Sequence, residues 1–395
     1  MAPGKSLNAM KRFHIDKKEL LTRLIIGLIG FALLAGLRIY AVQDRSVYES
    51  TATTGVEYEK ALVLEVLEDN TELNHDAEDT IVGTQLLSLE LTSGRYAGDQ
   101  VEIYNHLSPY YSVVAQEGMT LSVRVLTTGN NEYTVSVYNY ERIPWLMIFI
   151  AVFLLALILI GGKQGFSAVF GLSFTMGGVI FVLMPLLVQR GWPPIPTTLL
   201  IVALTMFVSY VFIGGLHTKS MVATLGSFGG VLLAGLFAFA AGELVHISGL
   251  NMDEAEPLLL TAADGGLKIK GLLICGILIA AEGAIMDISM SVSSSVDELH
   301  RVNPALTAKE LFRSGMNIGR DAMGTMANTL VLAFAGTGLN TMLLIYAYDA
   351  SFEQLMNAEF LSMELIRAIA GSLGMILTVP LVALLSARIL TAKKK

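Results

Sequence analysis

The sequence predicts a polytopic α-helical membrane protein of about eight transmembrane helices, with a small extracytoplasmic β-barrel-like domain between helices 1 and 2. Three observations predict this fold class: an apolar composition, repeated apolar runs of membrane-spanning length, and one acidic, β-rich insert. Hydrophobic residues make up 53% of the 395-residue chain, charged residues make up 15%, and the mean hydropathy is +0.61. A soluble chain of this length carries more charge, so the composition is that of an integral membrane protein.

The spans follow from the rule that about 20 consecutive apolar residues cross a bilayer as a helix. The first apolar run follows a tail at 1–21 and is interpreted as an uncleaved anchor, because no small-residue cleavage site follows it. The multi-spanning domain is predicted at 143–392, where a segment at 255–270 could be a re-entrant or surface helix. The eight predicted spans are 22–42, 143–161, 166–189, 197–214, 221–247, 269–292, 322–346 and 362–389.

Basic residues predict the orientation, because cytoplasmic loops carry an excess of Lys and Arg. The basic tract at 11–18, Lys163, Lys219 and the tail at 393–395 all fall on one side of the eight-span arrangement. Both termini are therefore predicted to be cytoplasmic, with residues 43–142 outside. The basic tracts are short and flank membrane segments, so the predicted partner is the lipid bilayer and no nucleic acid is expected.

The outer segment differs from the rest of the chain in charge and periodicity. Between Asp44 and Glu141 there are 17 acidic and 4 basic residues, which favours cationic or basic ligands over anionic ones. Short β-rich runs separated by turn residues indicate a small barrel, and residues 69–80 are predicted to form an exposed acidic loop. The five predicted strands are 61–68, 84–94, 100–107, 120–127 and 132–140.

The fifth predicted span carries small residues at every fourth position, a spacing that lets helix backbones approach closely in lipid. This face is interpreted as tight helix packing, with a substrate groove as the alternative. Glu243 and His246 close the span before an acidic loop, so either a cation-attracting mouth or ordinary solvated charges are expected there. The small residues are Gly226, Gly230, Ala234, Ala238 and Gly242, and the acidic loop residues are Asp253, Glu254, Glu256 and Asp264.

A polar stripe in the sixth predicted span is the sharpest functional signal. Asp287 lies within an apolar run, where an ionisable group costs about 2.5–3.5 kcal/mol on insertion scales. A carboxylate in a low-dielectric site holds its proton more tightly and can exchange it near neutral pH. The alternative is a structural bond between helices, for example with Arg320. Glu282 lies nearly opposite on the helix; it is also a candidate for the proton relay, with a contact to another helix as the alternative. The residues that share the face of Asp287 are Ser291, Ser294, Ser295 and Glu298.

A second polar stripe opens the next segment, after a loop with its own predicted helix at 306–315. Thr307 and Glu310 form a capping-box pattern in that helix. Because consecutive antiparallel helices usually pack together, the two stripes are expected to face each other and to form a polar seam from the membrane interior to the cytoplasm. The second stripe consists of Asn317, Asp321, Gly324, Thr325 and Asn328, with Arg320 one residue off it.

Motifs of known enzyme classes are absent. The sequence has no HExxH, GxSxG or P-loop pattern, so no enzyme activity, no catalytic residue and no ATP-driven pump are predicted. The single cysteine, Cys275, excludes an internal disulfide and a Cys-based zinc site. No cofactor and no bound metal are therefore predicted.

Four runs of residues carry a family resemblance. They are GAIMDISMSVSSSVDEL at 283–299, NPALTAKELFRSGMNIGRDAMGTMANTLVLAFAG at 303–336, HISGLNMDEAEPL at 246–258 and SGRYAGDQVEIYNHL at 93–107. With them the chain resembles the YibE/F family of bacterial multi-spanning membrane proteins from about residue 57 to residue 389. The resemblance implies the plasma membrane of a bacterium, and a Gram-positive one by the distribution of the family. It brings no catalytic residues.

A weaker architectural likeness links the chain to the SecD/SecF and RND transporters. They also place an extracytoplasmic domain after the first span and carry an intramembrane Asp that relays protons. Asp287 after Gly283 would take that place here, with Arg320 and Thr325 in the following span. The match is short and the span count differs by two, so it is an analogy of architecture.

The leading functional hypothesis is a secondary transporter or permease for an unidentified small solute or ion, driven by an ion gradient of protons. Asp287 would be the coupling carboxylate, with the serines of its stripe lining the path and the second stripe completing the seam. The alternative is a non-transporting scaffold or assembly protein whose outer domain recruits a partner, with the stripes joining helices. A homo-oligomer or a partner subunit is left open.

Overall fold

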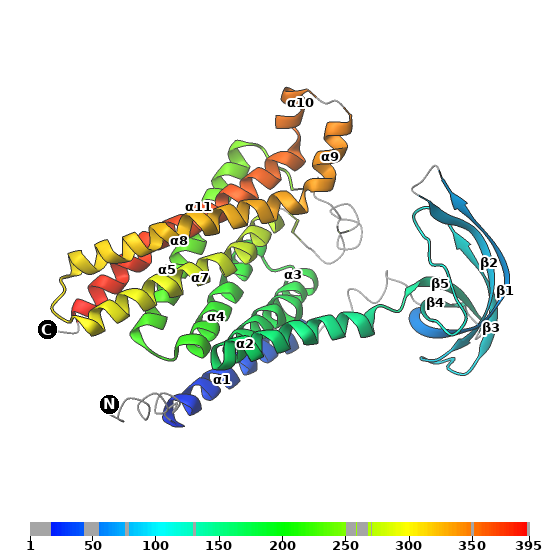
Figure 1. The fold of residues 1–395 in the computed structure, drawn as a ribbon, viewed down its shortest axis with the longest axis horizontal. Coiled ribbons are helices and arrows are strands. Elements are labelled where there is room, and N and C mark those ends of the chain that lie inside the picture. Colours follow the sequence, from blue (N-terminus) through cyan, green and yellow to red (C-terminus); the bar gives the residue numbers. More distant parts are fainter. Residues whose placement is uncertain are drawn as a thin grey trace, which may run out of the picture. The chain divides into compact units, whose positions relative to one another are not determined.

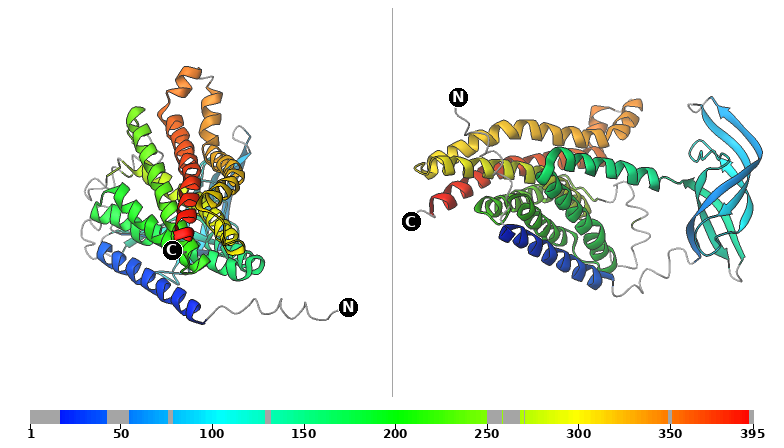
Figure 2. Two further views of the ribbon diagram at one scale, coloured as in Figure 1. Left: turned by 90° about the vertical axis from the view of Figure 1, so that its left-hand side faces the viewer. Right: turned by 60° about the horizontal axis from the view of Figure 1, so that its bottom comes forward.

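A computed structural model describes residues 17–42, 55–75, 79–128, 132–249, 258, 268–269, 271–348 and 351–392. The chain divides into two compact units, Glu49–Ala156 and Met1–Tyr48 with Leu157–Lys395. We call the first the β unit and the second the helical unit. Figures 1 and 2 show a curled sheet in the β unit and a bundle of long helices in the helical unit.

The β unit is built on one antiparallel sheet with the strand order β3-β2-β1-β4-β5. The sheet curls into a half-barrel (Figure 1), whereas the sequence predicted a barrel; no ladder joins β3 to β5 among the described residues. The five strands are β1 (Val56–Asn74), β2 (Thr80–Leu91), β3 (Gln100–Leu107), β4 (Thr120–Thr128) and β5 (Glu132–Tyr140).

Alternation along β2 explains the core of the β unit. Gln85, Leu87, Leu89 and Leu91 are buried while the residues between them are only partly buried, as expected for a strand with one face on a core. The prediction of an acidic loop at 69–80 is wrong for much of its length, because β1 continues to Asn74, where it pairs with the start of β2 at Thr80. Residues 76–78 of that loop lie outside the described part.

The described residues contain six helices that are long and apolar enough to cross a membrane, or seven if the bent pair α8 and α9 forms one span. One of the six, Ile143–Arg190, begins in the β unit and continues into the helical unit. These helices make the chain a membrane protein. The elements are α1 (Lys17–Val42), α2 (Ile143–Gly178), η3 (Val179–Leu183), α3 (Met184–Arg190), α4 (Pro194–Gly214), α5 (Thr218–Leu244), α7 (Leu272–Val302), α8 (Ala308–Thr337), α9 (Leu339–Ala347), α10 (Phe352–Met356) and α11 (Glu359–Ala392).

The helical stretch Ile143–Arg190 is broken at Gly162. Its 48 residues would extend about 72 Å as a straight helix, more than twice the hydrocarbon core of about 30 Å. Gly162 has φ 55° and ψ −127°, a conformation that glycine adopts without a steric penalty. A Cβ on Gly165 would lie 1.9 Å from the backbone oxygen of Leu157, although residues eight apart in a straight helix are about 12 Å apart along the axis. The chain therefore turns sharply at Gly162.

The small residues of α5 form a close contact with α11, so the predicted helix packing is confirmed. A Cβ on Gly230 would lie 1.7 Å from Thr378 Oγ1, and one on Gly226 would lie 2.3 Å from Val382 Cγ2. On the α11 side, a Cβ on Gly374 would lie 2.5 Å from the Cβ of Ala234. Because α11 also packs against α7 and α8, it is the helix around which this half of the bundle is assembled.

The helix α8 begins with the predicted capping box, in which Glu310 N–H donates to Thr307 Oγ1 and Thr307 N–H donates to Glu310 Oε2. The sequence predicted a separate loop helix at 306–315 and a span from 322. The structure instead continues one helix to Thr337 and then bends by 57° into α9. The two predicted elements form one helix because neighbouring helices pack closely against Gly315 and Gly319. This packing stabilises the helix where the sequence suggested a break.

Candidate functional site

The structure buries Glu282 and leaves Asp287 on the surface. Glu282 of α7 is 2% exposed, and Thr205 of α4 donates a hydrogen bond of 2.8 Å from Oγ1 to its Oε1. Its Oε2 is buried and has no hydrogen-bond partner among the described residues. An unsatisfied buried carboxylate oxygen is costly, and in a native structure such a group calls for a specific explanation, such as a functional role or a bound water or ion.

Buried serines continue from Glu282 along the same face of α7. Ser289 and Ser293, at +7 and +11, are each 1% exposed and share the face of Glu282 by helical spacing. Ser293 Oγ donates a hydrogen bond of 2.7 Å to the backbone oxygen of Lys219, in the first turn of α5. Eleven residues of helix cover about 16 Å, so this face carries polar groups from Glu282 to the Lys219 end of the bundle.

The neighbouring helices α4 and α5 add hydroxyls to this face. Tyr210 of α4 is fully buried, and its hydroxyl donates to the backbone oxygen of Met286 at 3.2 Å and shares a hydrogen bond with Ser227 of α5. The buried polar groups thus come from three helices. We call the set the inner polar row; it consists of Thr205, Tyr210, Ser227, Glu282, Ser289 and Ser293.

The sequence contains a signal for the α7 serines of the inner polar row, which the prediction missed although it included Glu282. Glu282, Ser289 and Ser293 are spaced by seven and four residues, which places them on one helical face. The apolar residues Ile285 and Val292 flank them, and both are fully buried. The outer face of α7 has more polar residues than the inner face, and they follow one another at helical spacing, so the prediction chose the outer face.

The predicted stripes of α7 and α8 both lie on the surface of the helical unit. On α7, Ser294 and Ser295 are half-buried and the other members are exposed, and on α8 every predicted polar member is exposed. We call this set the outer stripe. It consists of Asp287, Ser291, Ser294, Ser295 and Glu298 on α7, and Asn317, Arg320, Asp321, Thr325 and Asn328 on α8.

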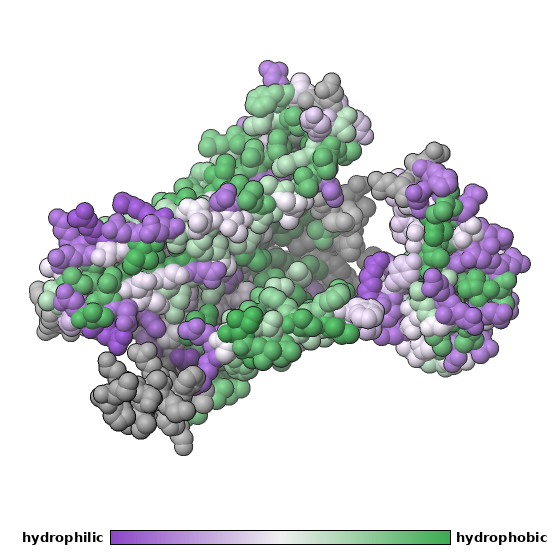
Figure 3. Space-filling view, in the orientation of Figure 1, coloured by the Kyte–Doolittle hydropathy of each residue, from purple (hydrophilic) through white to green (hydrophobic). Residues whose placement is uncertain are grey.

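The expected seam between the two stripes is not formed. The face that α8 turns inward carries Leu311, Gly315 and Gly319; a Cβ on Gly315 would lie 2.9 Å from Val296 of α7, and one on Gly319 would lie 2.1 Å from Val379 of α11. These glycines allow close packing, which turns the polar face of α8 outward. Glu298 pairs with Arg301 of its own helix, and Thr325 Oγ1 donates to the backbone oxygen of Ala322 on its own helix. Figure 3 shows hydrophilic residues gathered over the part of α8 that follows the α7–α8 loop.

The predicted cation-attracting mouth is only partly described. Gly242 and Glu243 line a cavity of about 240 Å³, together with Ile195, Gly271 and Leu273. The acidic loop residues predicted to complete the mouth, Asp253, Glu254, Glu256 and Asp264, lie outside the described residues. Within the described ranges, no group of three or more His, Cys, Asp or Glu side chains is arranged to hold a metal ion.

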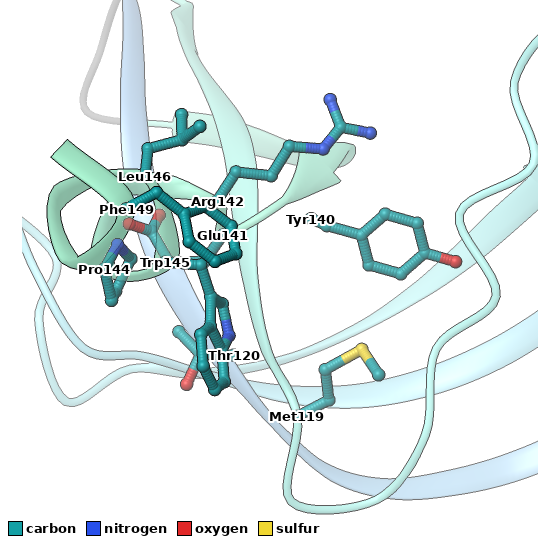
Figure 4. Close-up of a pocket in the computed structure, with 9 residues that line it drawn as sticks. All are labelled: Met119, Thr120, Tyr140, Glu141, Arg142, Pro144, Trp145, Leu146 and Phe149. Atoms are coloured by element: carbon teal, nitrogen blue, oxygen red, sulfur yellow. The ribbon is translucent and has the colours of Figure 1, made fainter. Parts of the chain in front are cut away.

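A larger cavity, of about 510 Å³, lies within the β unit where β5 leads into α2. Figure 4 shows Tyr140 and Met119 on one side of it, with Trp145 and Phe149 from the start of α2 on the other. The lining is mainly apolar, and Glu141 lies 3.2 Å from Lys60, which offsets its charge. No nucleophile–base pair is present among the lining residues, which are Met119, Thr120, Tyr140, Glu141, Arg142, Pro144, Trp145, Leu146 and Phe149.

Comparison with known proteins supports the resemblance seen in the sequence. A family model described as YibE/F-like protein matches residues 149–392. The match covers more than half of the chain and includes both the inner polar row and the outer stripe. A search of the curated proteins and a search of the solved structures found no match. With its apolar spans and this family match, the chain belongs to the YibE/F-like family of membrane proteins.

Proposed function

We propose that this protein is a secondary transporter driven by a proton gradient, with Glu282 as the group that binds the coupling proton. One observation carries the proposal: Glu282 is buried between helices, one of its oxygens has no partner among the described residues, and it stands at the end of the inner polar row. Ionisable groups inside membrane segments are rare, face the bundle interior, and mark ion pathways and proton relays.

The inner polar row supplies groups that can pass a proton. A hydroxyl both donates and accepts hydrogen bonds, so Tyr210, Ser289 and Ser293 can each take part in a relay between Glu282 and the Lys219 end. Thr205 holds one oxygen of Glu282 and leaves the other free to accept a proton or a bound water. Because the charged form of Glu282 is costly in this setting, gain or loss of the proton is linked to the packing of α4 against α7.

The transporter proposal moves the coupling role from Asp287 to Glu282. Asp287 is exposed on α7, whereas Glu282 is buried and accepts a hydrogen bond from Thr205 of α4. The proposal keeps the arrangement of eight spans by counting the turn at Gly162 as a break between two spans and the pair α8–α9 as one span. In that arrangement the Lys219 end of the inner polar row is cytoplasmic and the β unit is outside.

The proposal is tested by proton flux into liposomes that hold the purified protein, read with an internal pH dye under an imposed gradient. Wild type is compared with Glu282→Gln and with the matched carboxylate-to-amide variant Asp287→Asn. We expect flux in wild type and in Asp287→Asn, and loss of flux in Glu282→Gln. Thr205→Val should change the pH dependence of flux, because it removes the donor to Glu282.

Two results would overturn the assignment. Flux that persists in Glu282→Gln and is lost in Asp287→Asn returns the coupling role to Asp287. Folded wild-type protein that conducts no protons contradicts proton coupling and favours the second candidate, a scaffold or assembly protein. The observation that favours this second candidate is the exposed outer stripe, whose polar residues suit contact with another membrane protein.

A further inference from the structure

Charged residues of the outer stripe lie at a depth where spanning helices normally face lipid. The helix α7 has 31 residues and would be about 46 Å long, whereas the hydrocarbon core takes only about 20 residues. If the core begins with the apolar run at Leu272, it reaches Ser291 and includes Asp287, which is exposed. Such groups usually face a bundle interior or a partner, and the described residues of the helical unit give Asp287 neither.

Arg320 of α8 lies at nearly the same depth as Asp287. The antiparallel helices α7 and α8 meet where Gly315 approaches Val296. Arg320 follows Gly315 by five residues on α8, and Ser291 precedes Val296 by five residues on α7, so Arg320 and Ser291 lie at the same depth. Asp287 lies four residues from Ser291, which is about one helical turn or 6 Å along the axis. An arginine side chain covers that distance. Both residues are exposed, and within the described chain no ion pair joins them.

Symmetry determines which residues of two copies can meet. Two copies in one bilayer have the same orientation, so a two-fold axis that relates them runs along the membrane normal. Residues of equal depth then face each other, and each contact occurs twice. Arg320 and Asp287 lie at similar depth on adjacent helices, so each can face a residue of opposite charge in a second copy. The other carboxylates of the outer stripe are Asp321 and Glu298, and Glu298 already pairs with Arg301 of its own chain.

We propose that a second copy of this chain binds the outer stripe, with Arg320 of each copy paired to Asp287 of the other. Lipid would leave both charges unpaired, whereas a second copy supplies an opposite charge for each. The uncharged members Ser291, Asn317 and Asn328 add hydrogen-bonding groups between the helices, as polar residues do at helix contacts in membranes. The inference does not depend on transport, because the α7 members of the inner polar row, Glu282, Ser289 and Ser293, lie on the buried side of that helix.

The first test is disulfide cross-linking in native membranes. The only cysteine, Cys275, is buried and is replaced by Ala, and single cysteines are then introduced at Ser291 and Asn328. The matched control is Leu236→Cys on α5, which is 64% exposed and lies away from the outer stripe. We expect cross-linked dimers from at least one stripe position and not from Leu236→Cys. Cross-linking that is absent from both stripe positions, or equal at all three positions, overturns the proposal.

The second test measures the charge pairing by counting photobleaching steps of labelled protein in liposomes over a range of protein-to-lipid ratios. Arg320→Glu and Asp287→Arg should each raise the ratio needed for half-dimerisation by about tenfold or more, and the double variant should restore it. Arg388→Glu, at an exposed arginine of α11, is the control for charge reversal alone. Wild-type protein that is monomeric at every ratio, or a double variant that restores nothing, overturns the proposal.

Discussion

Substitution of Gly230 by alanine should weaken the contact between α5 and α11. The new Cβ would lie 1.7 Å from Thr378 Oγ1 and 3.1 Å from the backbone oxygen of Gly374, where ordinary contact begins at 3.4 Å. The distance to Thr378 Oγ1 is about 1.7 Å short of the 3.4 Å of an ordinary contact. Either the helices separate by that amount, or Thr378 rotates and loses its hydrogen bond of 2.7 Å to the backbone oxygen of Gly374. Overpacking of this kind costs about 1–3 kcal/mol.

The net loss of stability is smaller than the steric cost, because alanine is the better helix former by up to about 1 kcal/mol. We therefore expect the free energy of unfolding to fall by up to about 2 kcal/mol in Gly230→Ala. The control is Gly276→Ala on α7, where no described atom lies within 4 Å of the new Cβ. There we expect no loss and a gain of up to about 1 kcal/mol.

The assay is unfolding by sodium dodecyl sulfate in mixed micelles, followed by circular dichroism. Adding Thr378→Ala to Gly230→Ala removes the atom nearest the new Cβ, so the double variant should be more stable than the sum of the single effects predicts. Equal stability of Gly230→Ala and Gly276→Ala, or strict additivity in the double variant, would refute the reasoning that this glycine is required by close helix packing.

The remaining predictions concern the turn in α2 and the β unit. Gly165→Ala should lower the melting temperature in detergent, because its Cβ would lie 1.9 Å from a backbone oxygen of the preceding segment; an unchanged melting temperature contradicts the sharp turn. Gln85→Leu should speed proteolysis of the loop after β3 in the full chain. The Ala115 N–H of that loop donates to Gln85 at 2.9 Å, and the loss of this partner costs about 1–3 kcal/mol. A cleavage rate equal to that of wild type would contradict this prediction. A hydrogen bond to Asp99 raises the pKa of Tyr133 to about 12, above its usual value of about 10. The bond therefore stabilises the fold below pH 10 and is lost as the pH rises through 12. Tyr133→Phe should remove phenolate absorbance that develops near pH 12, and a change confined to pH 10 would contradict the bond.

Apolar runs and strand alternation in the sequence predicted most of the fold. The helices α4, α5 and α11 correspond to apolar runs whose length alone predicts a span, and the alternation Gln85-Leu87-Leu89 predicts a buried strand face. The end of β1 was not predictable in this way, because its acidic residues resemble a solvated loop. Only the pairing with β2 keeps those residues in a strand, and such pairing is a long-range property that a local pattern does not contain.

The candidate site was harder to predict because the sequence of a helix with two polar faces does not show which of them packs against a neighbouring helix. Asp287 and Glu282 are both carboxylates in one apolar run, and the choice between them depends on which face of α7 packs against α4. On α8, the polar pattern predicted the inner face wrongly, because Gly315 and Gly319 lie on another face and their close approach to neighbouring helices determined the outcome. Small residues can therefore outweigh polar periodicity in orienting a membrane helix.

The central position of α11 affects how the chain is made. This helix packs against α5, α7 and α8, yet it is synthesised after all three. At a rate of about 5–20 residues per second, the earlier helices wait several seconds in the bilayer before their shared neighbour emerges. During that interval the glycine face of α5 and the inward face of α8 are in contact with lipid or with insertion factors. A ribosome that stalls before residue 359 therefore releases a product with unpaired helices, which cellular quality control can recognise.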